Sequence, residues 1–277
     1  NPAELTAEIS SATFDCPFMN IRFFGDGICF SRMIPLYTMN NQNINMVNIA
    51  DFEKISAELK ELLGLEGSPV AVKVVVSPED IPEDIPEIDE ATRHCRMVSL
   101  AREGQVFYAT DAKQQCGGGA WALGLREKGA TLKTGQHYFK LGKYETINSS
   151  RRTMEGVPSL PQENYAVIYA PLEKANFEPS VVLIFAKPMA MLKLAQSTLY
   201  NAGGRIYPEF AGIQSICSDA TAYVLLNGKP NFSLGCDGSR KFSGIKDEEM
   251  VAGFPIEVIA EVAENLKKVT AAPGSKK

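Results

Sequence analysis

Apolar side chains recur at helical spacing in three long stretches of the chain, and each stretch predicts an amphipathic helix. The first covers residues 51–63 and is followed by Gly64, a residue type that commonly ends a helix. The second, residues 188–204, opens with Pro188 and closes on two glycines. The third, residues 254–270, has a proline in its first turn and lysines in its last turn, an arrangement that suits the helix dipole.

Shorter runs of β-branched and aromatic residues predict strands. Helical spacing also returns in two short segments, 95–102 and 145–156. Residues 77–90 repeat proline among acidic residues, which predicts a solvated and partly extended loop. The predicted strands are 68–76, 105–110, 165–172 and 179–186.

Two parts of the chain, about residues 50–130 and 165–250, repeat one order of features. In each part a strand-like run precedes a cysteine that opens a helical stretch, and then come a glycine, a short strand and a second cysteine near glycine. The two cysteines are separated by 20 residues in the first part and by 18 in the second. This order predicts a duplicated βαβ-like unit, with chance similarity as the alternative. We therefore expect an α/β fold, or an α+β fold, of two pseudo-repeated halves around a mixed sheet.

The first 45 residues differ from the rest, because a polar, aperiodic segment precedes Met46 and the hydrophobic pattern starts afresh there. Residues 1–45 lack the charged start, apolar stretch and cleavage site of a signal peptide. We interpret them as an extension outside the main domain, or as an arm packed on it. The main domain is then a single domain of residues 46–270, followed by a frayed tail of residues 271–277.

Charge and apolar run length exclude two classes of partner. The formal net charge is −5 and no long basic run occurs, so a nucleic-acid partner is not expected. The longest apolar runs are far shorter than the roughly 20 residues of a membrane-spanning helix. We therefore expect a soluble protein that binds neither nucleic acid nor membrane.

Four of the six cysteines occupy corresponding positions in the two predicted halves: Cys95, Cys116, Cys217 and Cys236. Related halves often pack about a pseudo-two-fold axis, where corresponding residues can meet. Thiolates suit zinc and iron–sulfur clusters, and four is the usual number of ligands for either. The sequence therefore predicts one centre held by these four cysteines, either an iron–sulfur cluster of the 4Fe–4S type or zinc.

Glycines accompany the second cysteine of each half: Gly117, Gly118 and Gly119 in the first and Gly238 in the second. Residues without side chains let the backbone approach a bulky cofactor and leave amide groups free to hydrogen-bond its sulfur atoms. These four glycines are accordingly predicted to lie against the cofactor.

Other roles for the cysteines stay open, because the chain has no CxxC motif, which is the strong signal for zinc. Disulfides are one alternative, although no secretion signal indicates an oxidising compartment. Buried structural thiols are a second alternative. A reactive thiol is the third, since Cys95 and Cys217 each open a predicted helix, where the dipole can lower a thiol pKa.

Histidine and arginine side chains are further candidates. His94 adjoins Cys95 and is interpreted as an additional ligand or base, or as an ordinary hydrogen-bonded residue. The glycine-rich segment can bind an anion on its free amides, but it lacks the sequence of a P-loop or a dinucleotide site. Six arginines lie in or between the cysteine stretches and can pair with a small acidic ligand: Arg93, Arg96, Arg126, Arg151, Arg152 and Arg240.

An ordered series of motifs resembles the domain-of-unknown-function family 169, also described as ArCR, which occurs mainly in archaea and anaerobic bacteria. The likeness spans about residues 50–266 and leaves residues 1–45 outside it. It implies a cytoplasmic protein in an oxygen-poor setting, where oxygen-sensitive clusters survive, and it implies no particular reaction. The motifs are CRMVSLAREG at 95–104, CGGGAWALGL at 116–125, YAPLEKANFEPSVVLIFAKPMAMLKL at 169–194 and CSDATAYVLLNGKPNFSLGCDGSRKF at 217–242.

Three functions follow as hypotheses. The first is a cysteine-ligated metal or iron–sulfur protein that transfers electrons to a redox partner or supports an anaerobic pathway. The second is an enzyme that binds a small acidic molecule and uses Cys116 or Cys236 as its nucleophile. The third is a non-catalytic interaction protein, with a homo-oligomer as one form, whose cysteines lie in its core. No catalytic residue is assigned.

Overall fold

The computed structural model describes residues 23–24, 27–28 and 49–271 of the chain. The chain divides into two units, Asn1–Asn45 and Met46–Lys277. The sheet and the helices that carry the cysteines belong to the second unit.

The ends of the chain contribute little to the described structure. In the first unit, strands β1 (Phe23–Phe24) and β2 (Gly27–Ile28) pair antiparallel to each other. Cys16 and Cys29, with the rest of the predicted N-terminal extension, lie outside the described residues. The predicted tail begins inside a helix, because α10 (Ile256–Ala271) includes the first residue assigned to it.

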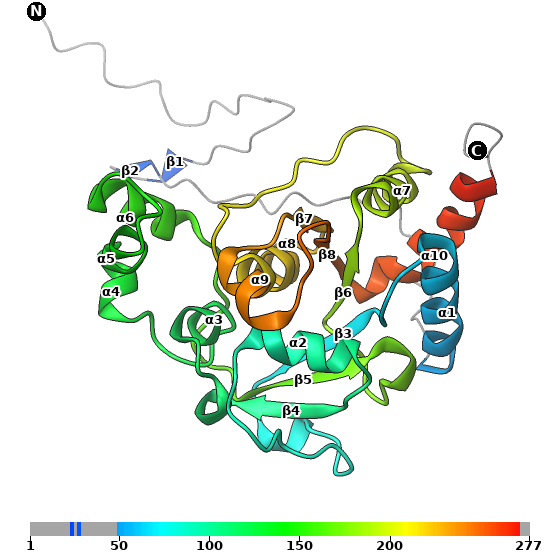
Figure 1. Ribbon diagram of the computed structural model, residues 1–277, viewed down its shortest axis with the longest axis horizontal. Helices are drawn as coiled ribbons and strands as arrows, with labels where there is room; N and C mark the ends of the chain where they lie inside the picture. Colours follow the sequence, from blue (N-terminus) through cyan, green and yellow to red (C-terminus); the bar gives the residue numbers. More distant parts are fainter. Residues whose placement is uncertain (1–22, 25–26, 29–48, 272–277) are drawn as a thin grey trace, which may run out of the picture. The chain divides into compact units, whose positions relative to one another are not determined.

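A six-stranded sheet forms the centre of the second unit, with the strand order β4-β5-β3-β6-β8-β7 (Figure 1). The combination of sheet and helices confirms the predicted α/β class in its broad sense. Every pairing in this sheet is antiparallel, so the expectation of a mixed sheet is wrong. The strands are β3 (Val70–Val75), β4 (Phe107–Thr110), β5 (Ala166–Pro171), β6 (Val181–Ala186), β7 (Asn231–Ser233) and β8 (Met250–Pro255).

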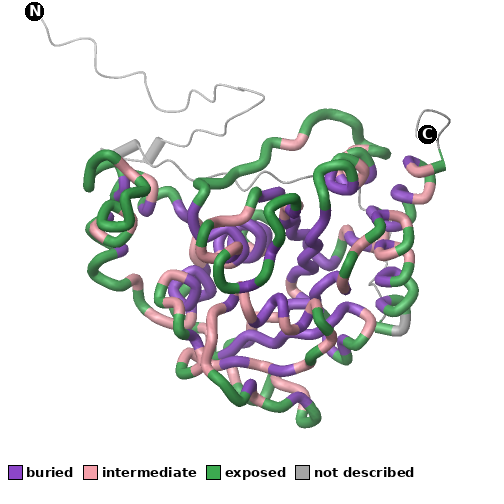
Figure 2. Tube along the Cα trace, in the orientation of Figure 1, coloured by how far each residue is buried: buried purple, intermediate pink, exposed green. Residues whose placement is uncertain are grey.

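The central strands are apolar throughout because both faces of the sheet are covered. All residues of β5 and β6 are buried (Figure 2). Alternate side chains enter two separate cores, so that Ile168 packs on one face and Val167 on the other. Continuous apolar strands are typical of parallel sheets, but double coverage produces the same pattern in an antiparallel one.

Helices cover the two faces in two groups, as Figure 1 shows. On one face lie α10, α1 (Phe52–Leu63) and α7 (Pro188–Leu199). On the other lie α2 (His94–Arg102), the π-helix η5 (Ser215–Ala222) and α8 (Tyr223–Asn227). Helices with the length and apolarity of a membrane span are absent from the described residues.

The predicted apolar face of the first helix is confirmed on α1, where four side chains at helical spacing are buried in one core. The helix ends at Gly64, which adopts the left-handed conformation with φ 62°. The buried residues of this face are Phe52, Ile55, Leu59 and Leu63.

The two halves of the sheet have the same strand order and register. In the first half β5 lies between β4 and β3, and in the second β8 lies between β7 and β6. Val70 pairs with Pro171 in the first half, as Val181 pairs with Pro255 in the second. The origin of the halves by duplication stays a prediction.

Several segments differ from the sequence-based expectation. The three consecutive glycines, a residue type that favours turns, begin the helix α3 (Gly117–Ala122). The proline-rich loop is not fully solvated, since Ile85 and Ile88 are buried. Strand β8 was not predicted, and its last two residues, Phe254 and Pro255, were assigned to the helix expected at 254–270.

Short helices complete the second unit between the longer elements. The helix predicted at 145–156 is present as α6 (Ile147–Gly156). The others are α4 (Ala130–Lys133), α5 (Gln136–Lys140), α9 (Asp237–Ser243), and the 3-10 helices η1 (Ile49–Asp51), η2 (Pro78–Asp80), η3 (Asp111–Lys113) and η4 (Leu172–Lys174).

Candidate functional site

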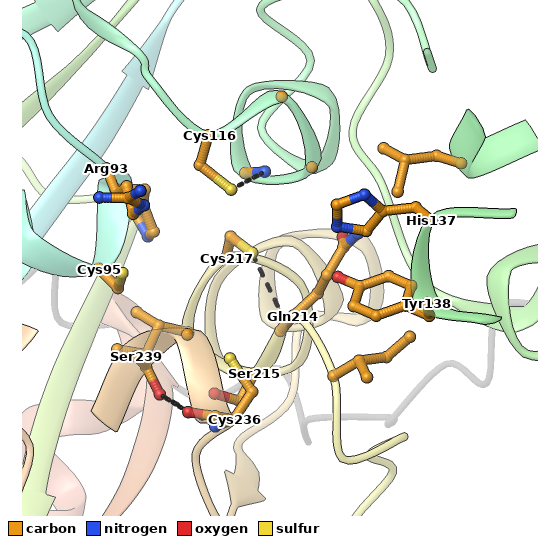
Figure 3. A pocket seen from close by; sticks show the side chains of 18 of the residues that line it. Arg93, Cys95, Cys116, His137, Tyr138, Gln214, Ser215, Cys217, Cys236 and Ser239 are labelled. Atoms are coloured by element: carbon orange, nitrogen blue, oxygen red, sulfur yellow. Dashed lines mark hydrogen bonds between the residues drawn. The ribbon is translucent and has the colours of Figure 1, made fainter. Parts of the chain in front are cut away.

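Four helix starts bring the four predicted cysteines to one pocket (Figure 3). Cys95 is the second residue of α2, and Cys217 is the third residue of η5. Cys116 and Cys236 are the N-cap residues of α3 and α9. The structure therefore brings together all four cysteines, two from each half of the sheet region.

Cys116 and Cys236 have the same local geometry. The backbone N–H of Gly119 donates to Cys116 Sγ at 3.4 Å, which satisfies one of the free amides at the start of α3. The sulfur of Cys236 likewise accepts from the backbone N–H of Ser239, whose Oγ in turn accepts from Cys236 N at 2.9 Å. Both thiols are thus held at helix N-termini by backbone donors.

The cavity between the cysteines has a volume of about 580 Å³, and all four predicted glycines line it. A side chain at Gly117 would meet no atom within 4 Å, so this position borders open space. Gly118 has a different role, because a Cβ there would lie 2.8 Å from Gln214 Nε2. A Cβ at Gly238 would lie 3.9 Å from Cys236 Sγ. The glycines therefore make room partly for the cavity and partly for Gln214.

Cys217 is presented by an unusual segment of backbone. Gln214, immediately before η5, has φ 52°, and no other described non-glycine residue has a positive φ. This conformation carries strain for a side chain of this size. The π-helix η5 approaches the sheet closely at Gly253, where a Cβ would lie 2.0 Å from Ala220 O. Strained and π-helical backbone is frequent at functional sites.

Burial dominates the electrostatics of two thiols. Burial, with smaller contributions from the nearby Cys236 and Cys116, raises the pKa of Cys95 to about 12. The pKa of Cys217 is also well above its usual value, first through burial and then through the other three cysteines. The predicted lowering of these two pKa values by helix dipoles is wrong, because desolvation outweighs the dipoles.

The four thiols border a cavity and do not converge on a point. They form no disulfide with one another. Within the described residues, no three histidine, cysteine, aspartate or glutamate side chains form a group that could hold a metal ion. A zinc ion needs Zn–S distances of about 2.3 Å to all its thiolates at once. The arrangement leaves space between the thiols.

His94 is buried, and both nitrogen atoms of its imidazole ring lie near hydroxyl groups. Its Nδ1 lies 2.8 Å from Tyr169 Oη, and its Nε2 lies 3.4 Å from Thr221 Oγ1. Burial lowers the His94 pKa to about 3, which keeps the ring neutral. Since hydroxyl groups engage both ring nitrogens, the structure does not support the interpretation of His94 as an additional ligand or base.

The predicted arginines are distributed over different roles. Arg93 and Arg126 line the pocket, and Arg126 is bound to Asp111. Arg240 donates to backbone carbonyls, including that of Glu249 at 3.1 Å. Neither Arg240 nor the other three line the pocket. Arg96 pairs with Glu103, Arg151 pairs with Glu155, and Arg152 is exposed.

Sequence reasoning missed several residues of the pocket. Ser215 is fully buried, lines the cavity, and its Oγ has no hydrogen-bond partner among the described residues. Tyr138 and Phe242 also line the cavity, and Phe242 stacks under the Arg93 guanidinium at 3.8 Å from the ring centroid. Nothing in the local sequence singles out these three side chains, because only the packing of α5, α9 and η5 brings them to the cysteines.

Comparisons with known proteins give one family and one relative. The model of DUF169, described as an uncharacterised ArCR family, matches residues 58–265. An uncharacterized protein of Methanocaldococcus jannaschii is 40% identical over 223 residues, which cover 80% of this chain and 96% of that protein. No solved structure gives a significant match.

Proposed function

The chain belongs to the DUF169 family, and the matched region contains the whole pocket. We propose that the protein binds an iron–sulfur cluster in this pocket. Cys95, Cys116, Cys217 and Cys236 are the ligands in this proposal, and a cluster of the 4Fe–4S type is the cofactor. The observation that carries it is the presence of four thiols, from four separate helix starts, around one cavity.

The position of the four cysteines around one cavity suits a cluster better than a single zinc ion. In an iron–sulfur cluster each thiolate binds a different iron atom, and sulfide ions fill the space between them. Such a cofactor needs an open volume bordered by four cysteines, and the pocket has this form. A zinc ion would need the same thiols to move together, because no described group is already arranged around a single ion.

Backbone groups near the thiols support the proposal independently. Gly119 N and Ser239 N donate to Cys116 and Cys236, and hydrogen bonds of this kind stabilise thiolate ligands and tune a cluster. Gly117 leaves open space where a side chain would project. The high pKa values of Cys95 and Cys217 mean that ligation would displace their protons.

Four protein ligands favour electron transfer over substrate activation, because they leave no iron atom open for a substrate. We propose that the protein works in the cytoplasm, in anaerobic metabolism. A redox partner would exchange electrons with the cluster at the open side of the pocket. A homo-oligomer is compatible with this role and is not required by it.

The test is metal and sulfide analysis of the full chain purified without oxygen. We expect iron and acid-labile sulfide in equal amounts, with broad visible absorption. Single Cys→Ser substitutions at Cys95, Cys116, Cys217 or Cys236 should remove most of the iron. Cys16→Ser and Cys29→Ser serve as matched controls and should keep it.

A colourless, iron-free parent protein would contradict the proposal, as would full iron content in all four pocket variants. Zinc bound in place of iron and sulfide would support the cysteine site but reject the cluster.

One observation favours a second candidate, an enzyme with a cysteine nucleophile and a small acidic substrate. The cavity volume of about 580 Å³ lies in the range of about 300–1,000 Å³ that small-molecule sites occupy. Arg93 and Arg126 line it. This candidate predicts that Cys116 or Cys236 reacts much faster with iodoacetamide than Cys95 and Cys217, whose raised pKa values keep them protonated. Equal, slow labelling of all four would reject it and leave structural cysteines as the remaining interpretation.

A further inference from the structure

Arg93 presents a guanidinium group to the pocket without a carboxylate to neutralise it. The residue is the N-cap of α2, two positions before Cys95, and it lines the cavity. Its side chain stacks on Phe242 at 3.8 Å from the ring centroid and makes no ion pair with a carboxylate of the described residues. Phe242 belongs to α9, whose N-cap is Cys236. The stacking therefore fixes the positive charge between two of the cysteine-bearing helices.

Ser215 borders the same cavity, and its buried hydroxyl group has no acceptor among the described residues. Its residue is fully buried, and its Oγ has no hydrogen-bond partner in the described residues. A buried hydroxyl without a partner costs about 1–3 kcal/mol. Figure 3 shows Ser215 among the side chains that surround the cavity together with the four cysteines. Among the described residues, Arg93 thus lacks a negatively charged partner, and Ser215 lacks a hydrogen-bond acceptor.

We propose that Arg93 and Ser215 set the reduction potential of the cluster, Arg93 by its charge and Ser215 by a hydrogen bond to a sulfur atom. This inference rests on the proposed function. Four thiolates outweigh the positive charge of the iron–sulfide core, so the ligated cluster is an anion and gains one more negative charge on reduction. A positive charge and a hydrogen-bond donor stabilise the reduced form more than the oxidised form, which raises the potential.

The Arg93 charge is tested by a redox titration followed by electron paramagnetic resonance, on protein purified without oxygen. We expect Arg93→Leu to keep its iron and sulfide and to shift the midpoint potential to a more negative value. Arg93→Lys keeps the charge and should shift the potential less. Arg96→Leu is the matched control, because Arg96 lies on the same helix but pairs with the exposed Glu103. Its potential should equal that of the parent protein.

The Ser215 hydrogen bond is tested in the same titration. Ser215→Ala should assemble the cluster and also lower the potential. Ser197→Ala is its control, since Ser197 is equally buried but lies on α7, where it donates to Lys193 O at 2.7 Å and does not line the pocket. A hydroxyl with a purely structural role would change the unfolding temperature and leave the potential unchanged.

The outcomes separate this inference from the proposed function. If the parent protein assembles no cluster, both fall together. If the cluster assembles and neither Arg93→Leu nor Ser215→Ala moves the potential, this inference alone is overturned. A shift in Arg96→Leu equal to that in Arg93→Leu overturns the role of Arg93, because it would reflect the charge of the whole chain.

Discussion

A single carboxylate, that of Glu173, joins three segments of the chain. It accepts hydrogen bonds from Ser56 at 2.7 Å and from Ser68 and Lys60 at 2.5 Å. Burial raises the pKa of Glu173, but these donors outweigh burial and lower the pKa to about 2. Glu173 lies in η4, whereas its partners come from α1 and from the residue that precedes Pro69. The sequence alone marked none of them.

Glu173→Gln should therefore destabilise the fold by about 1–3 kcal/mol at neutral pH, because buried donors lose a charged acceptor. The measurement is urea unfolding, with the exposed Glu178→Gln as a control that removes the same charge. An unchanged free energy of unfolding in Glu173→Gln would contradict the role assigned to this carboxylate.

The pH dependence follows from the same lowered pKa. The folded state binds its proton near pH 2, whereas the unfolded chain binds it near the usual value of 4.5. The stabilisation is thus complete above about pH 4.5 and is lost as the pH falls towards 2. We expect the difference in stability between the parent protein and Glu173→Gln to shrink over this interval, as measured by unfolding at each pH.

At the scale of elements, the close approach of η5 to β8 positions Cys217. A glycine is required at position 253, because a Cβ would lie 2.0 Å from Ala220 O and 3.0 Å from Val224 Cγ2. Helical periodicity predicts that this segment is a helix, but a π-helix depends on contacts with the sheet. Its geometry is therefore a property of the packed pair of elements.

Gly253→Ala should push η5 away from the sheet and destabilise the fold by about 1–3 kcal/mol, the usual cost of overpacking. It should also reduce the iron content if the cluster proposal holds, since Cys217 moves with η5. The control is Gly156→Ala at the end of α6, where a Cβ meets no atom within 4 Å. Thermal unfolding and iron analysis are the measurements, and equal behaviour of the two variants would contradict this account.

At the scale of the whole second unit, one buried ion pair connects the two halves of the sheet region. Arg102, the last residue of α2, donates from Nη2 to Glu249 Oε1 at 2.5 Å and from Nη1 to Oε2 at 3.2 Å. The two side chains are 14% and 3% exposed, so neither is solvated well. The pair holds α2, and with it Cys95, against the segment that leads into β8.

Removing one partner of this ion pair should lower the free energy of unfolding strongly, because the other charge is left buried without a partner. Glu249→Gln is expected to lower the free energy of unfolding by about 3–5 kcal/mol, and adding Arg102→Met should restore part of it. The exposed pair Arg96–Glu103 is the control, with a loss of less than about 1 kcal/mol. A double-mutant cycle checks this prediction, and no coupling between positions 102 and 249 would contradict it.

Much of the fold was predictable because local periodicity reports which side chains are buried. The apolar spacing of residues 51–63 and the continuous apolar runs that became β5 and β6 were predicted from the sequence. The residue types at the candidate site were equally visible, since four cysteines stand at matching places in two similar stretches. Strand β8 was missed because its six residues run directly into the amphipathic pattern of α10.

The sequence by itself determined the longer helices, four of the six strands in the sheet, and which four thiols are available to one site. Only the tertiary structure decided that the sheet is antiparallel, that the thiols surround a cavity of about 580 Å³, and that Arg93 and Ser215 face it without partners. The physical reason is the range of the interactions. Periodicity arises between neighbours along the chain, whereas strand direction, cavity size and the pairing of buried polar groups depend on contacts between distant segments.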